Sequence, residues 1–220
     1  VACGTGFSAL APLQMVGNAG RVVGTDNNPA MLAMARTIPG GDGLSWTEAT
    51  GLALPFDVIE CDALVCPQSD PCFADVAAGV REMARVTRPG VRLALTVWTQ
   101  RADSPFLDAQ MEMLIEVCGI EPVVTSGAFI DDELTERRWV IDAGLTNVDV
   151  AVVRTEPDLP PIREFSLPHV NALPWSQPFF ELSPENQRAA IAFVHDRLAA
   201  YSTTTGMTLP FAAYLARITL

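Results

Sequence analysis

The chain has 220 residues, of which 26 are acidic and 14 basic, so its formal net charge is −12. This length fits one domain with room for an appended element, and the hydrophobic fraction of 49% is that of a globular protein. A chain this acidic repels phosphate backbones and anionic lipid headgroups, so we expect neither nucleic acid nor a membrane as partner. Every basic residue is arginine, which excludes a P-loop lysine and a Schiff-base lysine within the chain.

The five cysteines form no C-x-x-C pair, and their odd number argues against a disulfide framework. We therefore expect reduced thiols, a cytoplasmic location and no metal site. No apolar run reaches the roughly 18 residues that a membrane-spanning helix needs.

Taken in chain order, the first half alternates between helices and strands. The patterns predict helices over residues 8–16, 28–36 and 75–87, and strands over residues 21–26, 44–48, 61–66 and 91–98. Asn28 is suited to cap the second helix, and Pro29 to occupy its first position. This alternation indicates βαβ units, hence an α/β fold with a doubly wound parallel sheet.

The second half carries longer helical patterns and a proline-rich stretch. We predict helices over residues 103–118 and 131–143, a strand over 148–154, two helices within 162–202, and a last strand over 207–220. Gly144 is placed to end the second of these helices, and residues 156–161 separate the following helices from the rest.

A glycine turn opens the chain. Gly4 and Gly6, with Ala9, fit the pattern G-x-G-x-x-A, in which glycines let a ligand approach the backbone and the next helix offers unpaired N–H groups. Such a turn normally follows a buried strand of about five residues, so we expect the first strand to be largely missing from this chain. An ordinary strand-to-helix turn is the alternative.

Asp26 is the last residue of the strand predicted over residues 21–26, 20 residues after Gly6. An acid in this place can accept both hydroxyl groups of a ribose, although Asp-Asn-Asn also suits a solvated turn. These two features alone do not separate a nicotinamide dinucleotide from S-adenosylmethionine.

Four ordered blocks in residues 1–98 carry more information. They are Val1 to Gly6; Val23-Gly24-Thr25-Asp26 with Pro29 and Met31; Trp46-Thr47-Glu48 with Leu54-Pro55-Phe56 and Asp62 to Cys66; and Glu82 to Leu95 around Arg88-Pro89-Gly90. In this order they resemble the class I S-adenosylmethionine (SAM)-dependent methyltransferases, in the branch that acts on small molecules.

The resemblance implies a Rossmann-like methyltransferase sheet, mostly parallel with an antiparallel last strand, plus a helical insert. It divides the chain into a SAM-binding core at 1–155, an insert or lid at 156–206, and the core's final strand at 207–220. It also implies a set of cofactor-binding residues: Ala2, Cys3, Gly4, Gly6, Asp26, Asn27, Met31, Thr50, Gly51, Cys66 and Gln68. Thr50 stands where the family commonly has aspartate.

The function implied is methyl transfer from SAM to a small-molecule acceptor through an oxygen, nitrogen or carbon nucleophile. A general base is needed only for a poorly acidic O–H or N–H group. The candidates are His169, between Pro168 and Pro174, and Asp70, after the strand predicted over residues 61–66. A non-catalytic or decayed SAM-binding module is the alternative. An NAD(P)-dependent oxidoreductase is less favoured, since the chain lacks any Tyr–Lys pair.

Overall fold

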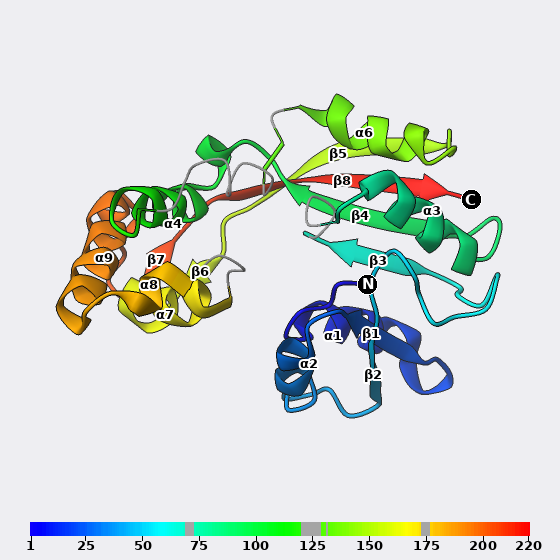
Figure 1. Cartoon of the computed structure of the whole chain (residues 1–220), viewed down its shortest axis with the longest axis horizontal. Helices are drawn as coiled ribbons and strands as arrows, with labels where there is room; N and C mark the ends of the chain where they lie inside the picture. The colour runs from blue at the N-terminus through cyan, green and yellow to red at the C-terminus, as the bar shows by residue number, and fades with distance from the viewer. Residues whose placement is uncertain (69–72, 120–128, 131, 173–176) are drawn as a thin grey trace. The chain divides into compact units, whose positions relative to one another are not determined.

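The computed structural model describes residues 1–68, 73–119, 129–130, 132–172 and 177–220. The α-helices of the described part are α1 (Phe7–Val16), α2 (Pro29–Ala35), α3 (Val76–Val86), α4 (Pro105–Glu116), α6 (Glu133–Asp142), α7 (Ile162–Ala172), α8 (Gln177–Glu181) and α9 (Pro184–Arg197) (Figure 1). The short 3₁₀ helices are η1 (Gly17–Ala19), η3 (Arg101–Asp103) and η5 (Ala199–Tyr201). The strands are β1 (Val22–Asp26), β2 (Leu44–Glu48), β3 (Leu64–Pro67), β4 (Arg92–Trp98), β5 (Val148–Thr155), β6 (Asp158–Leu159), β7 (Met207–Thr208) and β8 (Phe211–Thr219). Among the described elements, no helix combines the length and apolar character needed to cross a membrane.

The strands form three ladders. β1 pairs in parallel with β2, and a second sheet has the order β3-β4-β8-β5, in which β3 and β4 are parallel. β8 is antiparallel to β4, because Gly90 N–H bonds to the Leu220 carbonyl (2.6 Å) while Thr99 N–H bonds to the Ala212 carbonyl (3.2 Å). The predicted α/β fold with parallel strands and an antiparallel last strand is therefore confirmed.

Local signals in the sequence place several boundaries. The Asn28 carboxamide caps α2 by accepting from Ala30 N–H (2.9 Å), and Pro29 is its first residue, as predicted. Asp75 caps α3 in the same way through Ala78 N–H (2.8 Å). Gly144 adopts a φ of 87° directly after the end of α6, which only glycine adopts without strain.

Apart from shifts of one or two residues at element ends, the structure differs from the predictions in three places. The strand predicted over 61–66 begins at Leu64, since Asp62 and Ala63 are exposed. The described residues of 162–202 hold three α-helices rather than two. The strand predicted over 207–220 is divided into β7 and β8 at Pro210, which has no N–H to donate to a ladder, and β7 pairs with β6 instead.

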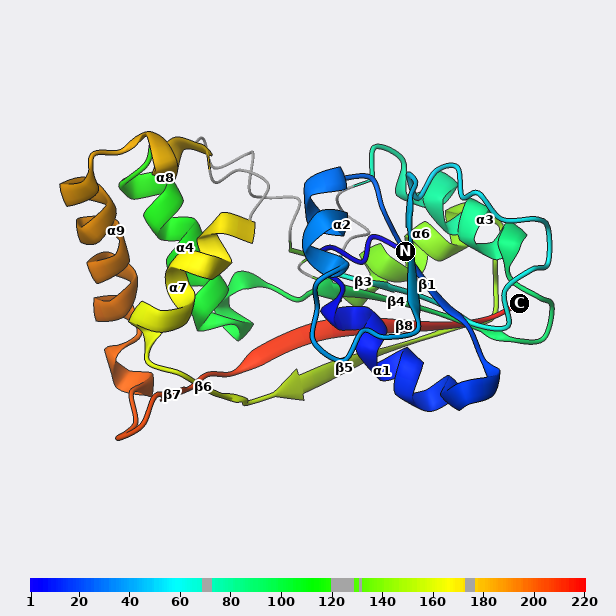
Figure 2. The same cartoon turned by 90° about the horizontal axis from the view of Figure 1, so that it is seen from below.

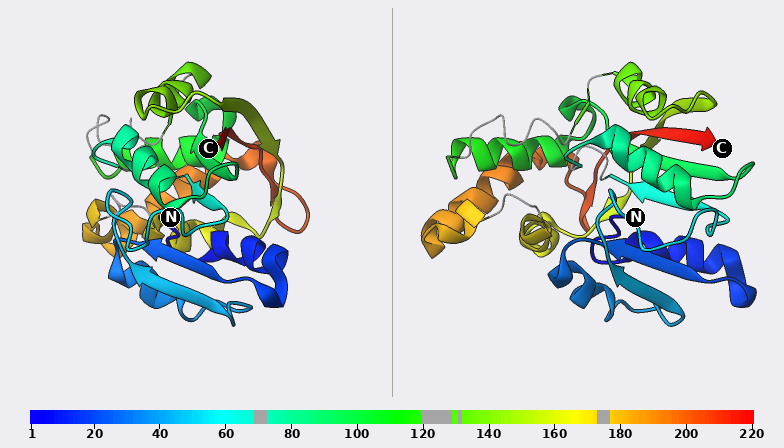
Figure 3. Two further views of the ribbon diagram at one scale, coloured as in Figure 1. Left: turned by 90° about the vertical axis from the view of Figure 1, so that its right-hand side faces the viewer. Right: turned by 45° about the vertical axis from the view of Figure 1, so that its right-hand side comes forward.

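The chain folds into two compact units. The first comprises Val1–Val97, Glu133–Ala151 and Tyr214–Leu220, and the second comprises Trp98–Asp132 and Val152–Ala213. Figure 3 shows β1 and β2 with α1 and α2 in the first unit, and Figure 2 shows α4, α7, α8 and α9 gathered in the second. The second unit thus contains α4 as well as the later helices α7, α8 and α9. The limits of the insert, at residues 156 and 206, stay a prediction.

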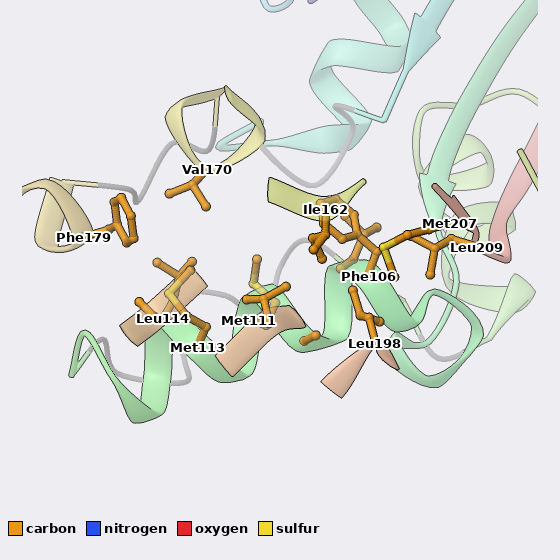
Figure 4. Packing of buried hydrophobic residues seen from close by; sticks show 14 residues of the cluster. Phe106, Met111, Met113, Leu114, Ile162, Val170, Phe179, Leu198, Met207 and Leu209 are labelled. Atoms are coloured by element: carbon orange, nitrogen blue, oxygen red, sulfur yellow. The ribbon is translucent and has the colours of Figure 1, made fainter. Parts of the chain in front are cut away.

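Each unit has its own hydrophobic core. The core of the first unit is formed by side chains of α3, β3, β4 and β8, among them Val80, Met83, Leu93, Leu95 and Ile218. The core of the second unit joins α4 to α7, α8 and α9 through Phe106, Leu114, Val170, Phe179 and Leu198 (Figure 4).

Candidate functional site

The glycine turn lies directly before α1 in the first unit. Gly4 and Gly6 have φ values of 54° and 90°, which favour glycine. A Cβ on Gly6 would lie 2.6 Å from the Trp46 ring, whereas a Cβ on Gly4 would meet nothing within 4 Å. Gly6 is therefore required by packing inside the unit, and the backbone at Gly4 is open to an approaching molecule.

Asp26 ties this turn to the end of β1. Its two carboxylate oxygens accept from Gly4 N–H (2.8 Å) and from Asn28 N–H (2.9 Å), and the residue is only 8% exposed. A carboxylate has about four acceptor positions, so two remain for hydroxyl groups. The structure thus joins the two features that the sequence singled out, Gly4 and Asp26, by a direct hydrogen bond.

Two further predicted residues follow Asp26 in the chain. Asn27 is exposed at the end of β1, and Met31 is half-buried in the first turn of α2. The Met31 N–H donates to the carboxamide of Asn28 (3.4 Å) as part of the helix cap. Both residues border the Asp26 side of the turn, and their role toward a cofactor stays a prediction.

Thr50 and Gly51 lie in a turn after β2. The Thr50 hydroxyl accepts from Leu52 N–H (3.3 Å), so it stabilises its own turn, and its side chain is exposed. A Cβ on Gly51 would lie 2.6 Å from the Phe73 ring, which covers this glycine. The sequence did not predict that Phe73 lies near Gly51, where its ring supplies an aromatic face beside two predicted cofactor-binding residues, Thr50 and Gly51.

Cys66 and Gln68 close the site at the end of β3. Cys66 is fully buried in the core of the first unit. Gln68 has a φ of 56°, and its N–H donates to the carbonyl (2.8 Å) and the hydroxyl (3.0 Å) of Thr96. Its Oε1 atom is buried and has no hydrogen-bonding partner within the described residues, so it can accept from a bound molecule.

Residues 1–3 form hydrogen bonds with the ends of both β1 and β3. The Val1 amine donates to the Val65 carbonyl (2.8 Å), and Cys3 N–H donates to the Thr25 carbonyl (2.9 Å). The ends of β1 and β3 therefore flank the glycine turn from two sides. Ala2, between these contacts, adopts a φ of 50°, a conformation in which alanine is strained.

The Cys3 thiol is not activated as a nucleophile. Burial, with a smaller contribution from the Asp26 carboxylate, raises the pKa of Cys3 to about 11. Burial also raises the pKa values of the Cys61 and Cys118 thiols. These three thiols therefore stay protonated near neutral pH, and none of them fits covalent catalysis.

A salt bridge between Glu82 and Arg85 holds residues 54–56 in place. Glu82 on α3 accepts from Leu54 N–H (2.7 Å) and from Arg85 Nε (2.7 Å), and Arg85 donates to the carbonyls of Leu54 and Phe56. The hydrogen bond from Arg85 is the main reason that the pKa of Glu82 lies below its ordinary value. The i,i+3 spacing of Glu82 and Arg85 in the sequence is typical of such an ion pair, although the pair was not predicted.

His169 lies on α7 in the second unit. Its ring packs edge-on against Phe106 at 4.9 Å between centroids, and burial lowers the pKa of His169 to about 4. Its Nδ1 atom is buried without a partner within the described residues, so the imidazole is neutral and can accept a hydrogen bond. The other base candidate, Asp70, lies outside the described residues.

Two more buried polar side chains accompany His169. Gln110 on α4 and Ser166 on α7 are fully buried, and their side-chain polar atoms have no hydrogen-bonding partner in the described part of the chain. Gln110 follows Phe106 by one helical turn, and Ser166 precedes His169 by one turn, so each pair shares a helix face. No spacing pattern indicated that these three side chains would be buried without partners.

Across the described residues, no three histidine, cysteine, aspartate or glutamate side chains are grouped so that they could hold an ion.

The open glycine turn, the acid at the end of the next strand and the mixed sheet define a Rossmann-like α/β protein. Residues 1–95 match the family model described as "Methyltransferase domain". The matched residues make up less than half of the chain, and the match agrees with their resemblance to the class I SAM-dependent methyltransferases.

The curated relatives that match the chain are also named as methyltransferases. Demethylmenaquinone methyltransferase of Deinococcus radiodurans is 36% identical over 108 residues, covering 48% of this chain and 44% of that protein. The chloroplastic 2-phytyl-1,4-beta-naphthoquinone methyltransferase of Arabidopsis thaliana is 30% identical over 129 residues, covering 56% of this chain and 49% of that protein. The chain thus matches about half the length of these curated relatives.

Solved structures share the fold at low identity. Geranyl diphosphate methyltransferase in complex with SAM has a TM-score of 0.52 and 18% identity, over 100% of this chain and 76% of that one. An arsenic(III) S-adenosylmethionine methyltransferase from Chlamydomonas reinhardtii has a TM-score of 0.57 and 16% identity, over 100% of this chain and 62% of that one.

Proposed function

We propose that the protein transfers a methyl group from SAM to a small-molecule acceptor. The observation that carries this proposal is the hydrogen bond between the open glycine turn at Gly4 and the carboxylate of Asp26, inside the 1–95 methyltransferase domain. A cytoplasmic location is part of the proposal, on the ground of the odd cysteine count and the lack of a disulfide pattern.

The residues of the first unit fit the cofactor. Asp26 has acceptor positions left for ribose hydroxyl groups, Gly4 leaves room for the methionyl part, and the unpartnered Gln68 Oε1 can accept from its ammonium group. When bound, SAM supplies an electrophilic methyl group on a sulfonium, so the protein's own part is to orient, desolvate and, where needed, remove a proton.

The acceptor is proposed to be an aromatic quinol, because the relatives described above are named as methyltransferases of demethylmenaquinone and of 2-phytyl-1,4-beta-naphthoquinone. In the helical unit, His169, Gln110 and Ser166 offer hydrogen-bonding capacity that no described protein group uses. A neutral His169 imidazole can accept a hydrogen bond from a hydroxyl group of a small molecule bound within the second unit, while Gln110 can both donate and accept. Burying such groups without partners costs about 1–3 kcal/mol each, which a polar ligand would offset.

Calorimetric titration with S-adenosylhomocysteine tests the cofactor, and radiolabelled methyl transfer to 1,4-naphthohydroquinone and other small phenols tests turnover. We expect micromolar binding and label in at least one acceptor. Binding without transfer to any acceptor would instead support a non-catalytic SAM-binding module. Absence of binding, with quenching of nicotinamide fluorescence, would favour an oxidoreductase and contradict the proposal.

A further inference from the structure

The residue directly after β3 has a strained backbone. Gln68 adopts a φ of 56°, in the left-handed region where a Cβ atom is disfavoured. Among the described residues, only Ala2 and Ile59 share a positive φ without being glycine. Such conformations persist only where the surrounding structure holds them, and they occur most often at binding and catalytic sites. Gln68 also lies at the carboxyl end of a parallel strand, which is where open α/β sheets bind ligands.

Thr96 on β4 holds this backbone in place. The Gln68 N–H donates to two oxygens of Thr96 at once, the carbonyl oxygen at 2.8 Å and the hydroxyl oxygen at 3.0 Å. The bond to the carbonyl continues the parallel ladder from the pair of Pro67 with Thr96, and any residue at position 96 could form it. The second bond requires a hydroxyl group. The core of the first unit does not, because it packs against the other face of β4, through Leu93 and Leu95.

The held backbone carries an acceptor that the described protein does not use. The Oε1 atom of Gln68 is buried and has no hydrogen-bonding partner within the described residues. A buried oxygen of this kind destabilises a protein unless a donor bonds to it. Glycine at this position would adopt the same φ without strain and would remove the oxygen. Gln68 therefore combines two unfavourable features, and a bound donor group would offset one of them.

The chemistry of the missing donor follows from the acceptor atom. A carboxamide oxygen only accepts, and its strongest hydrogen bonds come from charged N–H donors. The proposed cofactor carries one such donor, the ammonium group of its methionyl part, while its ribose hydroxyl groups are assigned above to Asp26. The methionyl carboxylate only accepts and cannot bond to this atom. The Gln68 oxygen therefore distinguishes a ligand with an ammonium group from one without it.

We propose that Thr96 is a positioning residue for cofactor recognition. Its hydroxyl group fixes the strained backbone of Gln68, and this fixed backbone holds the Oε1 atom where it accepts from the ammonium group of SAM or S-adenosylhomocysteine. Thr96 acts through Gln68 and not by contact with the ligand. This role rests on the proposed function, and it explains why a hydroxyl group is placed at position 96.

Calorimetric titrations with two ligands test this role. The ligands are S-adenosylhomocysteine and its analogue that lacks only the α-amino group, and the proteins are the wild-type chain, Thr96→Val and Thr96→Ser. We expect the wild type to bind S-adenosylhomocysteine about tenfold more tightly than the analogue. In Thr96→Val this preference should fall to about threefold, because valine keeps the branched shape but cannot accept from the Gln68 N–H. Thr96→Ser, which restores the hydroxyl group, should keep the full preference.

Thr99→Val is the matched control for the loss of a hydroxyl group. The Thr99 hydroxyl is buried and donates to the Ala212 carbonyl (3.2 Å), so valine removes a hydrogen-bonded hydroxyl there as well. We expect this variant to lower the thermal midpoint and to leave the preference between the two ligands unchanged, because the Thr99 hydroxyl bonds to Ala212 and not to Gln68.

A measurement without ligand tests the strain at Gln68. We expect Gln68→Gly to raise the thermal midpoint of the ligand-free protein by about 2 °C, because glycine adopts this φ freely and removes the unpartnered oxygen. The same variant should bind the two ligands with equal affinity. A lower midpoint together with an unchanged preference would show that Gln68 only stabilises the fold, and it would overturn the proposal.

The wild-type titration separates the two ways in which the idea could fail. An unchanged preference in Thr96→Val, or an equal loss of affinity for both ligands, would overturn the role of Thr96 and leave the proposed function intact. A wild-type chain that binds neither ligand would contradict the proposed function, and the role of Thr96 would fail with it.

Discussion

At the scale of single residues, the two glycines of the turn are required for different reasons. Gly6 combines a φ of 90° with a Trp46 ring that leaves no room for a Cβ, while Gly4 has a φ of 54° and open space beside it. We expect Gly6→Ala to lower stability by about 2–4 kcal/mol and Gly4→Ala by only about 1 kcal/mol, measured by urea unfolding. Equal losses would mean that Trp46 moves aside freely.

Asp26 has a structural role as well as the proposed role toward ribose. Gly4 N–H and Asn28 N–H bond to different oxygens of Asp26, and Asn in its place offers only one acceptor atom, because the amide nitrogen only donates. We expect Asp26→Asn to weaken S-adenosylhomocysteine binding by about 10–100-fold in calorimetry, whereas Asp42→Asn, in an exposed loop, leaves it unchanged. Full affinity in a destabilised Asp26→Asn protein would limit this residue to holding the turn.

The unpartnered polar groups of the second unit give a prediction about stability. Gln110→Leu removes a buried carboxamide that bonds to no described protein group, so it should raise the thermal midpoint by about 2–4 °C. The same variant should leave S-adenosylhomocysteine affinity unchanged, because the proposed cofactor residues all belong to the first unit. A lower midpoint would show that Gln110 stabilises the core of this unit.

At the scale of elements, the Glu82–Arg85 pair fastens residues 54–56 to α3. The pKa of Glu82 is lowered from 4.5 in the folded state, so its contribution to stability is present above about pH 4.5 and is lost as the pH falls through the folded pKa. We expect Glu82→Gln to lower the midpoint at pH 7 by about 3–6 °C, and the difference from wild type to shrink in acid.

The control for this prediction is Asp142→Asn, which breaks an exposed i,i+4 pair with Arg138 on α6. An exposed pair of this kind contributes about 0.5 kcal/mol or less, so its midpoint should change by no more than about 2 °C. A Glu82→Gln protein that keeps the same difference from wild type at pH 3.5 would contradict the assigned role of the carboxylate.

Elements with strong local signals could be predicted from the sequence, and those set by distant contacts could not. Asn28-Pro29 fixed the start of α2, and Asp75 fixed the start of α3. By contrast, Ser104 precedes α4 without capping it, because its hydroxyl accepts from Ala212 N–H (3.2 Å), more than 100 residues away. The division of the last strand had a local signal, Pro210, but its pairing with β6 did not.

The same distinction applies to the site. Gly4 and Asp26 were predicted from one short pattern, and the hydrogen bond that joins them was not needed to find them. The position of Phe73 over Gly51 and the burial of Gln110 and Ser166 depend on packing between segments that no spacing rule connects.

At the scale of the whole molecule, the two separate cores suggest two steps of unfolding. The proposed cofactor residues, including Asp26 and Gln68, all belong to the first unit, and a ligand stabilises only the unit whose folded state binds it. We therefore expect saturating S-adenosylhomocysteine to slow amide exchange in the core of α3, β3 and β4 and to raise the corresponding calorimetric midpoint. Exchange in the core of α4 and α9 should change little. If both cores gained the same protection in one transition, the units would unfold together, and the strands β4, β5 and β8, which contribute to both units, would be the reason.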